Sequence, residues 1–308
     1  MRLIEFMESF PDEASCKHAF KVMRDKEGVV CRKCKHKEHY YLKTVSHFKC
    51  KKCGCRTTLR SGTVMQHAKL SFRHWFIAMH LISATKKGFS ALEIQRQLNH
   101  KYYRPIWYML HKLRRTMGER DDKHQLEGLI EVDEAMVTVH PGDQAKTKRG
   151  RGSEGKSIVL VLAQTKYVKN KKNEEVKVCQ YVKMKCVNSF SAVDLQTEMV
   201  MSIKEESKIQ TDGNPSYNGC EMFFKKHIAK VLKASEIGKF LPVVHINISN
   251  VKRKILDIHH CVRPQYLQNY LNEFCYKQNR IPSGVNIFDR LLIASVTGWS
   301  KCLVHLSD

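Results

Sequence analysis

Apolar residues recur at helical spacing through the first 120 residues of the chain and at strand-like spacing after residue 128. Ser71 precedes an apolar stripe of helical period, and the Ser90–Glu93 capping box opens a shorter segment that ends near Leu98. A short turn follows, and Pro105 suits the first turn of a third helix. The pattern predicts a helical region over residues 69–120.

Beyond residue 128 the apolar runs follow the order strand, strand, strand, helix, strand, with acids on the first and fourth strands. This order predicts an α/β fold with an RNase H-like mixed sheet, in which the first and fourth strands lie side by side. Asp133 and Asp212 would then face each other, although 79 residues separate them. Two adjacent carboxylates repel unless a divalent cation lies between them. The runs are Leu129–Ala135, Ile158–Ala163, Val176–Val182, Phe190–Ile203 and Lys208–Asp212.

Four of the twelve cysteines form two C-x2-C pairs near the N-terminus. Cys31 with Cys34 and Cys50 with Cys53 are separated by 15 residues, a spacing typical of zinc sites. Four thiolates complete a tetrahedral site, so we predict a structural Zn2+ that replaces a hydrophobic core in this small ribbon. Other candidate ligands lie nearby, but the paired cysteines already fill four positions; they are Cys55, His36, His39 and His47.

The charge of the chain points to a polyanionic partner. Lys and Arg total 54 against 30 Asp and Glu, a formal charge of +24. Residues 15–75 hold 16 basic and three acidic residues, an excess of 13. Nucleic acid is the first candidate, and a merely soluble basic protein is the alternative. Basic residues that decorate the ribbon are expected to contact phosphates: Lys33, Lys35, Lys37, Lys49, Lys51, Lys52 and Arg56.

Several classes of protein are disfavoured. The longest clean apolar run, Ile158–Ala163, is far short of the about 20 residues that a membrane span needs. Glu5 and Glu8 interrupt the apolar N-terminus, which argues against a secretory signal. Paired cysteines of metal-binding spacing favour a reducing compartment. We therefore expect a cytoplasmic protein with no membrane partner.

The predicted helices near residue 100 form a helix-turn-helix candidate for DNA binding. Its second helix is basic, with Lys112, Arg114 and Arg115 mostly off the apolar face. Plain helical packing would give a similar pattern and stays open as the alternative. A basic, glycine-rich loop over residues 146–156 is expected to hold phosphates through Lys148, Arg149 and Arg151.

The order and spacing of several motifs, over nearly the whole chain, resemble bacterial insertion-sequence transposases of the zinc-ribbon DDE type. The motifs include CRKC…FKCKKCG, SFRHWFIAMHLI, KKGFSALEIQRQL, IEVDEA, TDGNPSY, ISNVKR and YLNEFCYKQNR. The resemblance implies a DNA strand-transfer enzyme with two Mg2+ ions, and Asp133 and Asp212 match its first two catalytic acids. It also implies an N-terminal helix and zinc ribbon over 1–68, the helix-turn-helix region over 69–120 and a catalytic domain over 126–300.

The third catalytic position departs from the usual glutamate. Asn250, 38 residues after Asp212, matches the variant in which asparagine replaces glutamate, and Lys252 matches the lysine that follows it. The amide oxygen of Asn250 could ligate Mg2+, and Lys252 could hold a phosphate. Glu273 is the rival third acid, with a structural helix residue as its alternative interpretation. Glu134 is expected to point to the opposite face of the strand from Asp133 and to be a poor ligand.

The resemblance implies that the chain cleaves and joins DNA strands at the terminal repeats of an insertion sequence. Its partners would be the element ends and the target DNA, and it would act as a homo-oligomer in a nucleoid-associated DNA complex. Two alternatives stay open: a non-catalytic zinc-ribbon regulator derived from a transposase, and a nuclease of the same fold. The presence of both Asp133 and Asp212 argues against the regulator.

Overall fold

The computed structural model describes residues 1–140, 155–231, 240–281 and 286–297, which fall into two compact units. The N-terminal unit comprises Met1–Met117 together with the segment that begins at Asn286, and the sheet unit comprises Gly118–Val285. The sequence suggested instead a separate helical region over 69–120 and one domain over 126–300. In the structure, the ribbon and the helices that precede residue 118 belong to one unit, and the helix that begins at residue 287 belongs to the same unit.

The N-terminal unit carries a small antiparallel sheet beside two helices, α1 (Leu3–Ser9) and α2 (Glu13–Glu27). The sheet has the order β1-β2-β3 over His39–Leu42, His47–Cys50 and Arg56–Thr58. The buried Arg24 of α2 donates hydrogen bonds to the carbonyl oxygens of Thr58, Leu59 and Ser61, at the end of β3 and just beyond it. These bonds attach the small sheet to the helices.

The helical region forms as the capping residues predict. Ser71 and Ser90 each accept a hydrogen bond from the backbone N–H three residues later, at the starts of α3 (Phe72–Ala84) and α4 (Ala91–Gln97). The third helix, α5, runs over Tyr103–Asp121. The last helix of the described residues, α10 (Ile287–Val296), packs on α2 and α3, and the ring of Phe288 contacts the rings of Phe6 and Phe76.

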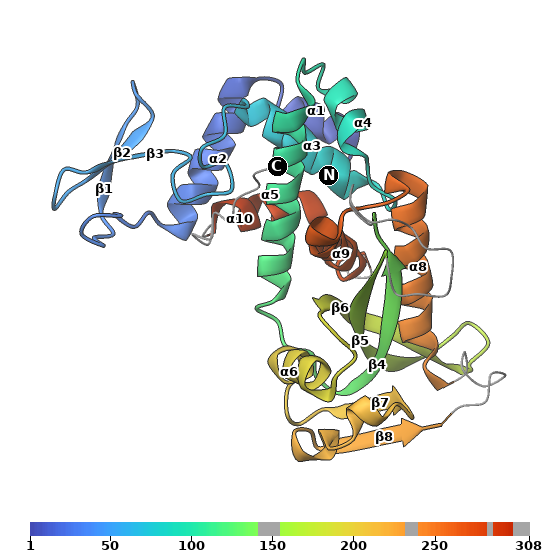
Figure 1. Ribbon diagram of the computed structural model, residues 1–308. Helices are drawn as coiled ribbons and strands as arrows, with labels where there is room; N and C mark the ends of the chain where they lie inside the picture. The colour runs from blue at the N-terminus through green and yellow to red at the C-terminus, as the bar shows by residue number, and fades with distance from the viewer. Residues whose placement is uncertain (141–154, 232–239, 282–285, 298–308) are drawn as a thin grey trace. The chain divides into compact units, whose positions relative to one another are not determined.

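The sheet unit contains the mixed sheet that the sequence predicts, with one additional strand (Figure 1). The strand order is β6-β5-β4-β7-β8; β4, β5 and β6 are antiparallel, whereas β7 runs parallel to β4 and β8 parallel to β7. This topology confirms the RNase H-like fold class. The strands are β4 (Leu129–Thr138), β5 (Lys156–Lys169), β6 (Glu175–Val187), β7 (Lys208–Asp212) and β8 (Lys226–Lys230).

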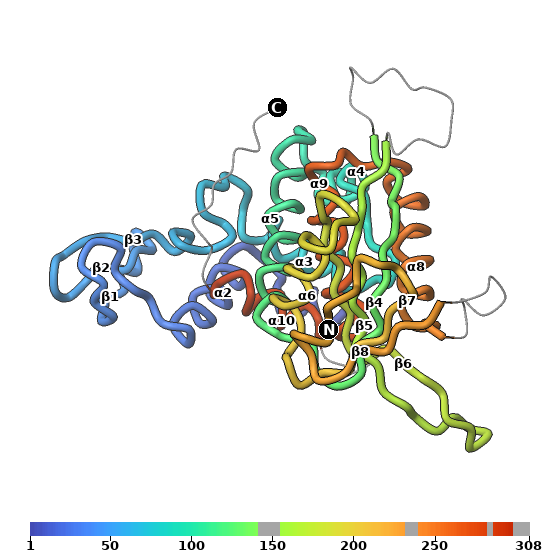
Figure 2. Tube along the Cα trace, turned by 60° about the horizontal axis from the view of Figure 1, so that its bottom comes forward, coloured from blue at the N-terminus to red at the C-terminus, as the bar shows by residue number. Residues whose placement is uncertain are grey.

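Helices cover the two faces of this sheet and create two cores. On one face, α6 (Ala192–Ser202) packs against even-numbered residues of β4 such as Val132. On the other face, α8 (Pro242–His259) and α9 (Pro264–Gln278) pack against odd-numbered ones such as Ala135. Figure 2 shows α6 and α8 on opposite sides of β4 and β5. Two short 3-10 turns, η1 (Pro215–Tyr217) and η2 (Cys220–Met222), connect β7 to β8.

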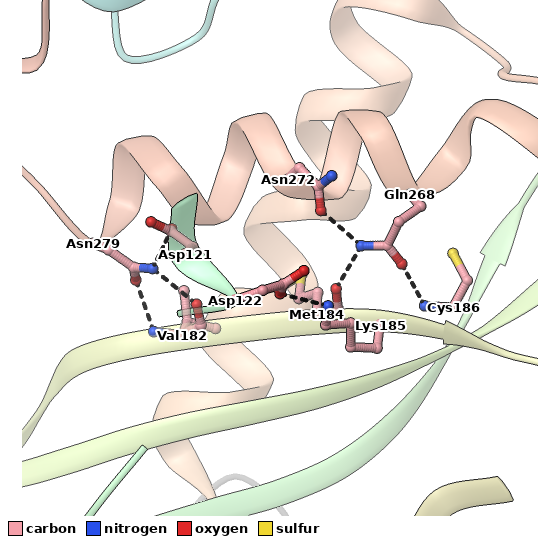
Figure 3. Close-up of polar contacts among 9 residues, drawn as sticks. All are labelled: Asp121, Asp122, Val182, Met184, Lys185, Cys186, Gln268, Asn272 and Asn279. Carbon is pink, nitrogen blue, oxygen red and sulfur yellow. Dashed lines mark hydrogen bonds and ion pairs between the residues drawn. The ribbon is translucent and has the colours of Figure 1, made fainter. Parts of the chain in front are cut away.

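Side-chain amides from α9 and the residue after it occupy the outer edge of β6 (Figure 3). Asn279 accepts a hydrogen bond from the backbone N–H of Val182 and donates one to its carbonyl, at 2.7 and 3.0 Å. Gln268 accepts from the N–H of Cys186 and donates to the carbonyl of Met184, at 2.8 and 3.0 Å. An amide presents a donor and an acceptor side by side, as a neighbouring strand does, so these side chains satisfy backbone groups that a sheet edge leaves unpaired.

Gly118 lies in the last turn of α5, where a methyl group has no room. A Cβ atom there would overlap the side-chain amide of Asn272, and Asn272 is held by a hydrogen bond from Gln268. Replacing an exposed helical glycine by alanine ordinarily stabilises a helix by about 1 kcal/mol. Here we expect Gly118→Ala to destabilise the protein by about 1–3 kcal/mol, because the side chains must shift.

Urea unfolding of Gly118→Ala measures this effect, and Asn272→Ala in the same background is the matched control. The double variant should recover most of the loss, because truncation of the Asn272 side chain leaves space for the new methyl group. A Gly118→Ala protein that is as stable as the wild type would show that Asn272 moves aside at no cost.

Candidate active site

Three carboxylates converge where β7 ends. The ligand atoms of Asp133, Glu134 and Asp212 all lie within 4.8 Å of one another. The parallel ladder between β4 and β7 stops at the pair Glu131–Gln210, so the two strands are no longer hydrogen-bonded where these acids project. The structure thus brings together the two acids that the sequence paired, from strands 79 residues apart, and adds a third.

Glu134 was expected to be a poor ligand candidate, but its carboxylate lies within 4.8 Å of the ligand atoms of both aspartates. The alternation on which that expectation rested does hold: Asp133 shares the face of Ala135, under α8, whereas Glu134 shares the face of Val132, under α6. The difference arises beyond the last rung of the β4–β7 ladder, where β7 is no longer hydrogen-bonded to β4. There the Glu134 side chain reaches the same point as Asp133 from the other side.

A turn after β7 connects two of the acids through Asn214. The backbone N–H of Asn214 donates to the Asp212 carboxylate at 3.1 Å, and its side-chain amide donates to Glu134 at 3.3 Å. The Asn214 side-chain oxygen accepts from the N–H of Ser216, which fixes the turn. Asn214 belongs to the TDGNPSY motif, but nothing in the sequence pattern indicated that its amide lies between two carboxylates.

The environment of the site favours the protonated form of two of its acids. The pKa of Asp133 is raised to about 6, mainly by burial and also by the charge of Asp212, whereas the hydrogen bond from the Glu134 N–H and the charge of Lys252 lower it. Burial raises the pKa of Glu134 to about 7, with the nearby Asp133 and Asp212 adding to the rise and the Tyr217 hydroxyl opposing it. A divalent cation would relieve this repulsion, and an all-oxygen donor set suits Mg2+ or Mn2+.

Glu134→Gln is expected to stabilise the protein at pH 8 when Mg2+ is left out. Since the pKa of Glu134 is raised from 4.5 to about 7, the native state keeps a proton that the unfolded chain releases in that interval. The contribution of Glu134 to stability therefore falls as pH rises from 4.5 to about 7, whereas glutamine does not titrate. Solvent screens part of this effect because the side chain is only half-buried. We therefore expect the free energy of unfolding to rise by about 1–2 kcal/mol at pH 8.

Urea unfolding of wild type and Glu134→Gln at pH 8 and pH 5 checks this expectation. The gain should shrink as pH is lowered, because both proteins then carry a neutral side chain. An equal gain at the two pH values would show that the effect comes from packing and not from charge.

Helix α8 brings two further side chains to the acids along one flank. The His245 Nδ1 atom lies 3.4 Å from the Asp133 carboxylate, and the charge of Lys252 acts on the same carboxylate. Seven residues make nearly two turns, so both lie on one side of the helix. The start of α8 is fixed to β4, because the buried Glu131 accepts a hydrogen bond from the Val244 N–H at 2.9 Å.

Asn250 lies on the opposite flank of α8. At 100° per residue it is about 140° around the helix from His245. Buried residues that include Val244 and Val251 lie between the two flanks. In the part of the chain that the structure describes, no hydrogen bond joins Asn250 to the three acids. The charge of Lys252 therefore acts on Asp133, whereas Asn250 lies on the other flank of the helix.

Glu273, the rival third acid, belongs to a buried ion-pair cluster. It is 2% exposed and lies 3.1 Å from the Lys254 ammonium and 3.7 Å from that of Lys277. The acidic cluster described above does not include it. This environment favours the structural interpretation of Glu273, since a buried carboxylate with two lysine partners already has its charge compensated.

The four paired cysteines form a second cluster, in the N-terminal unit. Their sulfur atoms lie within 4.8 Å of one another, and the Cys31–Cys53 and Cys34–Cys50 separations are both 3.5 Å, too long for a disulfide bond. Each pair sits in a tight turn that ends at a residue of positive φ, Lys35 or Gly54. Four thiol sulfurs this close together can coordinate Zn2+ in a tetrahedral arrangement. The alternative ligands Cys55, His36, His39 and His47 are outside the cluster.

The predicted DNA-binding side chains of α5 are less accessible than their pattern suggests. Arg114 is only 1% exposed, so the expectation that it lies off the buried face is wrong; His111 and Thr116 are buried as well, and burial extends around the helix. The Lys112 ammonium donates to the Gln66 carbonyl at 2.6 Å, and burial lowers its pKa. Arg115 is half-buried. Lys148, Arg149 and Arg151 lie outside the described residues.

The basic residues of the ribbon are exposed, as their predicted role requires. They are Lys33, Lys35, Lys37, Lys49, Lys51, Lys52 and Arg56. Within the described ranges, no helix is long and apolar enough to cross a membrane.

Comparisons with known proteins place this geometry in a family. Residues 125–279 match the model of the ISXO2-like transposase domain, and residues 11–57 match that of the transposase zinc-ribbon domain. An uncharacterized protein in the transposable element ISH50 of Halobacterium salinarum is 23% identical over 157 residues, which are 49% of this chain and 52% of the relative. The chain thus spans about half the length of the curated relative that it matches.

Two solved structures of the Mos1 transposase are distant matches. A pre-cleavage transpososome has a TM-score of 0.29 at 11% identity, and a paired-end complex with the left transposon end has a TM-score of 0.28 at 11% identity. Each match covers 76% of this chain and 82% of the other. The family model carries the assignment: it matches half of the residues, including both strands that bear the acids, and the chain therefore belongs to the ISXO2-like transposase domain family.

Proposed function

We propose that the protein is a metal-dependent DNA transposase that cleaves DNA at the ends of an insertion sequence and joins those ends to a target. The observation that carries the proposal is the convergence of Asp133, Glu134 and Asp212 on one point of an RNase H-like sheet, in a chain of a transposase-domain family. Clustered carboxylates that repel one another without a cation are suited to bind one.

The reaction is a pair of phosphodiester substitutions. Hydrolysis frees a 3′-hydroxyl at the element end, and that hydroxyl then attacks a target phosphodiester in line and displaces its 3′ oxygen. When bound, two Mg2+ ions would supply Lewis-acid activation of the attacking oxygen and stabilisation of the leaving one. Asp133 and Asp212 would hold them. His245, 3.4 Å from Asp133, would orient that carboxylate, and Lys252 on the same flank would bind a phosphate of the DNA.

The third catalytic position in this proposal is the Asn250 and Lys252 pair of the family variant. Lys252 has support in its action on Asp133, whereas Asn250 would have to approach the acids by a rotation or shift of α8 when DNA binds. For that reason we rank Asn250 below the two aspartates as a ligand.

The DNA partner would be held mainly by the N-terminal unit. The exposed basic residues of the zinc ribbon supply phosphate contacts, and the α4–α5 pair supplies a helix-turn-helix for the terminal repeats. Lys112, Arg115 and the loop residues Lys148, Arg149 and Arg151 are secondary candidates for DNA contact. Two ends must be joined to one target, so we expect a homo-oligomer in the DNA complex, in the cytoplasm at the nucleoid.

The test incubates the zinc-loaded protein with labelled element ends, Mg2+ and a target plasmid. Nicked ends together with end–plasmid joints would support the transposase. Nicked ends without joints would favour a nuclease of the same fold. Stable DNA binding with neither product, in Mg2+ and in Mn2+, would overturn the proposal in favour of a DNA-binding regulator.

A further inference from the structure

We propose that Glu134 is a third acidic ligand of the cation site and that Tyr217 positions its carboxylate. The inference rests on the proposed metal-dependent function and deepens it. It concerns the residue that supplies the negative charge missing from a site whose third position, Asn250, is neutral.

The first step is the charge of the site. Two divalent cations carry four positive charges, whereas Asp133 and Asp212 supply two negative ones, and an asparagine amide adds none. Glu134 raises the negative charge to three without any movement of the backbone, because its oxygen already lies within 4.8 Å of both aspartate oxygens. A third carboxylate next to two others is otherwise unfavourable in a half-buried position.

The second step is the direction of approach. Asp133 reaches the site from the α8 face of the sheet, and the β4–β7 register places Asp212 on that same face, whereas Glu134 reaches the site from the α6 face. Carboxylates that approach from both faces can surround a cation, as oxygen ligands of Mg2+ do. Asn214 holds two of the carboxylates in position, because it donates one hydrogen bond to Asp212 and one to Glu134.

The third step is an independent observation at Tyr217. Its side chain is fully buried in the core under α6, yet its hydroxyl has no hydrogen-bond partner among the described residues. The hydroxyl lies against the Glu134 carboxylate and feels the charges of Asp133 and Asp212, but its geometry falls short of a hydrogen bond. A buried hydroxyl without a hydrogen-bond partner is energetically costly. The Tyr217 hydroxyl faces the Glu134 carboxylate, so we infer that a small shift of that carboxylate completes a hydrogen bond between them.

These observations define what each residue does. When a cation is bound, one Glu134 oxygen contacts it and the other accepts a hydrogen bond from Tyr217. The Tyr217 hydroxyl thereby fixes which oxygen faces the metal, as residues around metal ligands commonly do. Glu134 would touch the metal, and Tyr217 would act only through Glu134. The competing interpretation is that Glu134 is a structural acid that merely satisfies Tyr217 and Asn214.

The experiment measures Mn2+ binding to the full-length, zinc-loaded protein without DNA, by the loss of the free-Mn2+ electron paramagnetic resonance signal. The variants are Asp133→Asn, Glu134→Gln and Tyr217→Phe. Glu127→Gln is the matched control: it removes the same charge from an exposed glutamate of the same unit, paired with Lys204 and about 20 Å away along the chain direction of β4. Thermal midpoints without Mn2+ show that each variant folds.

We expect Glu134→Gln to weaken Mn2+ binding at least about tenfold, Tyr217→Phe to weaken it by a smaller factor of about three to ten, and Glu127→Gln to bind as the wild type does. The Tyr217→Phe defect should vanish in the Glu134→Gln background, because the hydroxyl acts only through that carboxylate. A structural role for Tyr217 would instead lower the thermal midpoint and leave the Mn2+ affinity unchanged.

Three results would overturn the inference. If Asp133→Asn loses Mn2+ and Glu134→Gln keeps wild-type affinity, Glu134 is not a ligand, and the proposed transposase function stands without it. If Glu134→Gln binds Mn2+ normally but no longer cleaves DNA, Glu134 acts on the DNA and not on the metal. Wild-type affinity in all three variants would instead reject the acidic cluster as the cation site, and the proposed function with it.

Discussion

Asp133→Asn and Asp212→Asn should each lower the rate of strand cleavage by about 10³-fold or more while DNA binding persists. Each substitution keeps the shape of the side chain and removes a charge that offsets the cation, so the loss falls on metal binding and on stabilisation of the transition state. Most of the basic residues proposed to hold DNA are in the other unit of the chain, and none of the proposed contacts is altered. A gel assay of labelled element ends measures cleavage, and filter binding of the same DNA measures affinity.

The matched control for these variants is Asp122→Asn. Asp122 is a half-exposed aspartate of the sheet unit that pairs with Lys185 at 2.6 Å, outside the acidic cluster. It should cleave at the wild-type rate. Cleavage at the wild-type rate by both Asp133→Asn and Asp212→Asn would contradict the enzymatic interpretation altogether.

The same assay ranks the candidates for the third position. Asn250→Ala should lower cleavage less than either aspartate variant, because a neutral ligand holds a cation weakly. Glu273→Gln should act through stability, since it leaves Lys254 and Lys277 buried without their carboxylate. If Glu273→Gln abolishes cleavage without changing the thermal midpoint, Glu273 is the third acid and the structural interpretation of Glu273 is wrong.

Cys34→Ser is expected to remove zinc from the protein and to unfold the ribbon. Binding of a structural zinc contributes about 10–16 kcal/mol to small four-ligand domains, and such domains have no other core to keep them folded. The buried apolar residues within the ribbon are few, with Phe48 among them. Zinc content by atomic absorption should fall well below one ion per chain, and the affinity for DNA should fall with it.

Cys55→Ser is the control for the zinc prediction. Cys55 belongs to the same ribbon and is two residues from a proposed ligand, but its sulfur lies outside the four-sulfur cluster. It should keep one zinc ion and wild-type DNA affinity. Equal zinc content in Cys34→Ser and wild type would refute the proposed ligand set.

The elements that depend on local sequence could be predicted well. Ser71 and Ser90 cap their helices because a cap needs only its own turn. The C-x2-C pairs form their turns for the same reason. The side-by-side placement of Asp133 and Asp212 also followed from the sequence, since the order of elements restricts how a mixed sheet can be assembled.

The features that the sequence could not predict depend on where secondary structure stops or on distant contacts. Glu134 lies near the two aspartates because the hydrogen bonds between β4 and β7 end before it. The pattern of apolar residues does not show where the hydrogen bonding between two strands ends. The apolar stripe of α5 did not reveal that Arg114 is buried as well. The return of α10 to the N-terminal unit depends on contacts such as that between Val64 and Ser295, which are 231 positions apart.

The amides on the outer edge of β6 also bear on how the chain emerges from the ribosome. Val182 is synthesised 97 residues before Asn279, and Cys186 is synthesised 82 residues before Gln268. At translation rates of about 5–20 residues per second, the edge of β6 is left uncovered for about 4–20 seconds in a nascent chain. During that interval the unpaired backbone groups of β6 are open to pairing with other extended segments, and the emergence of α9 ends that exposure.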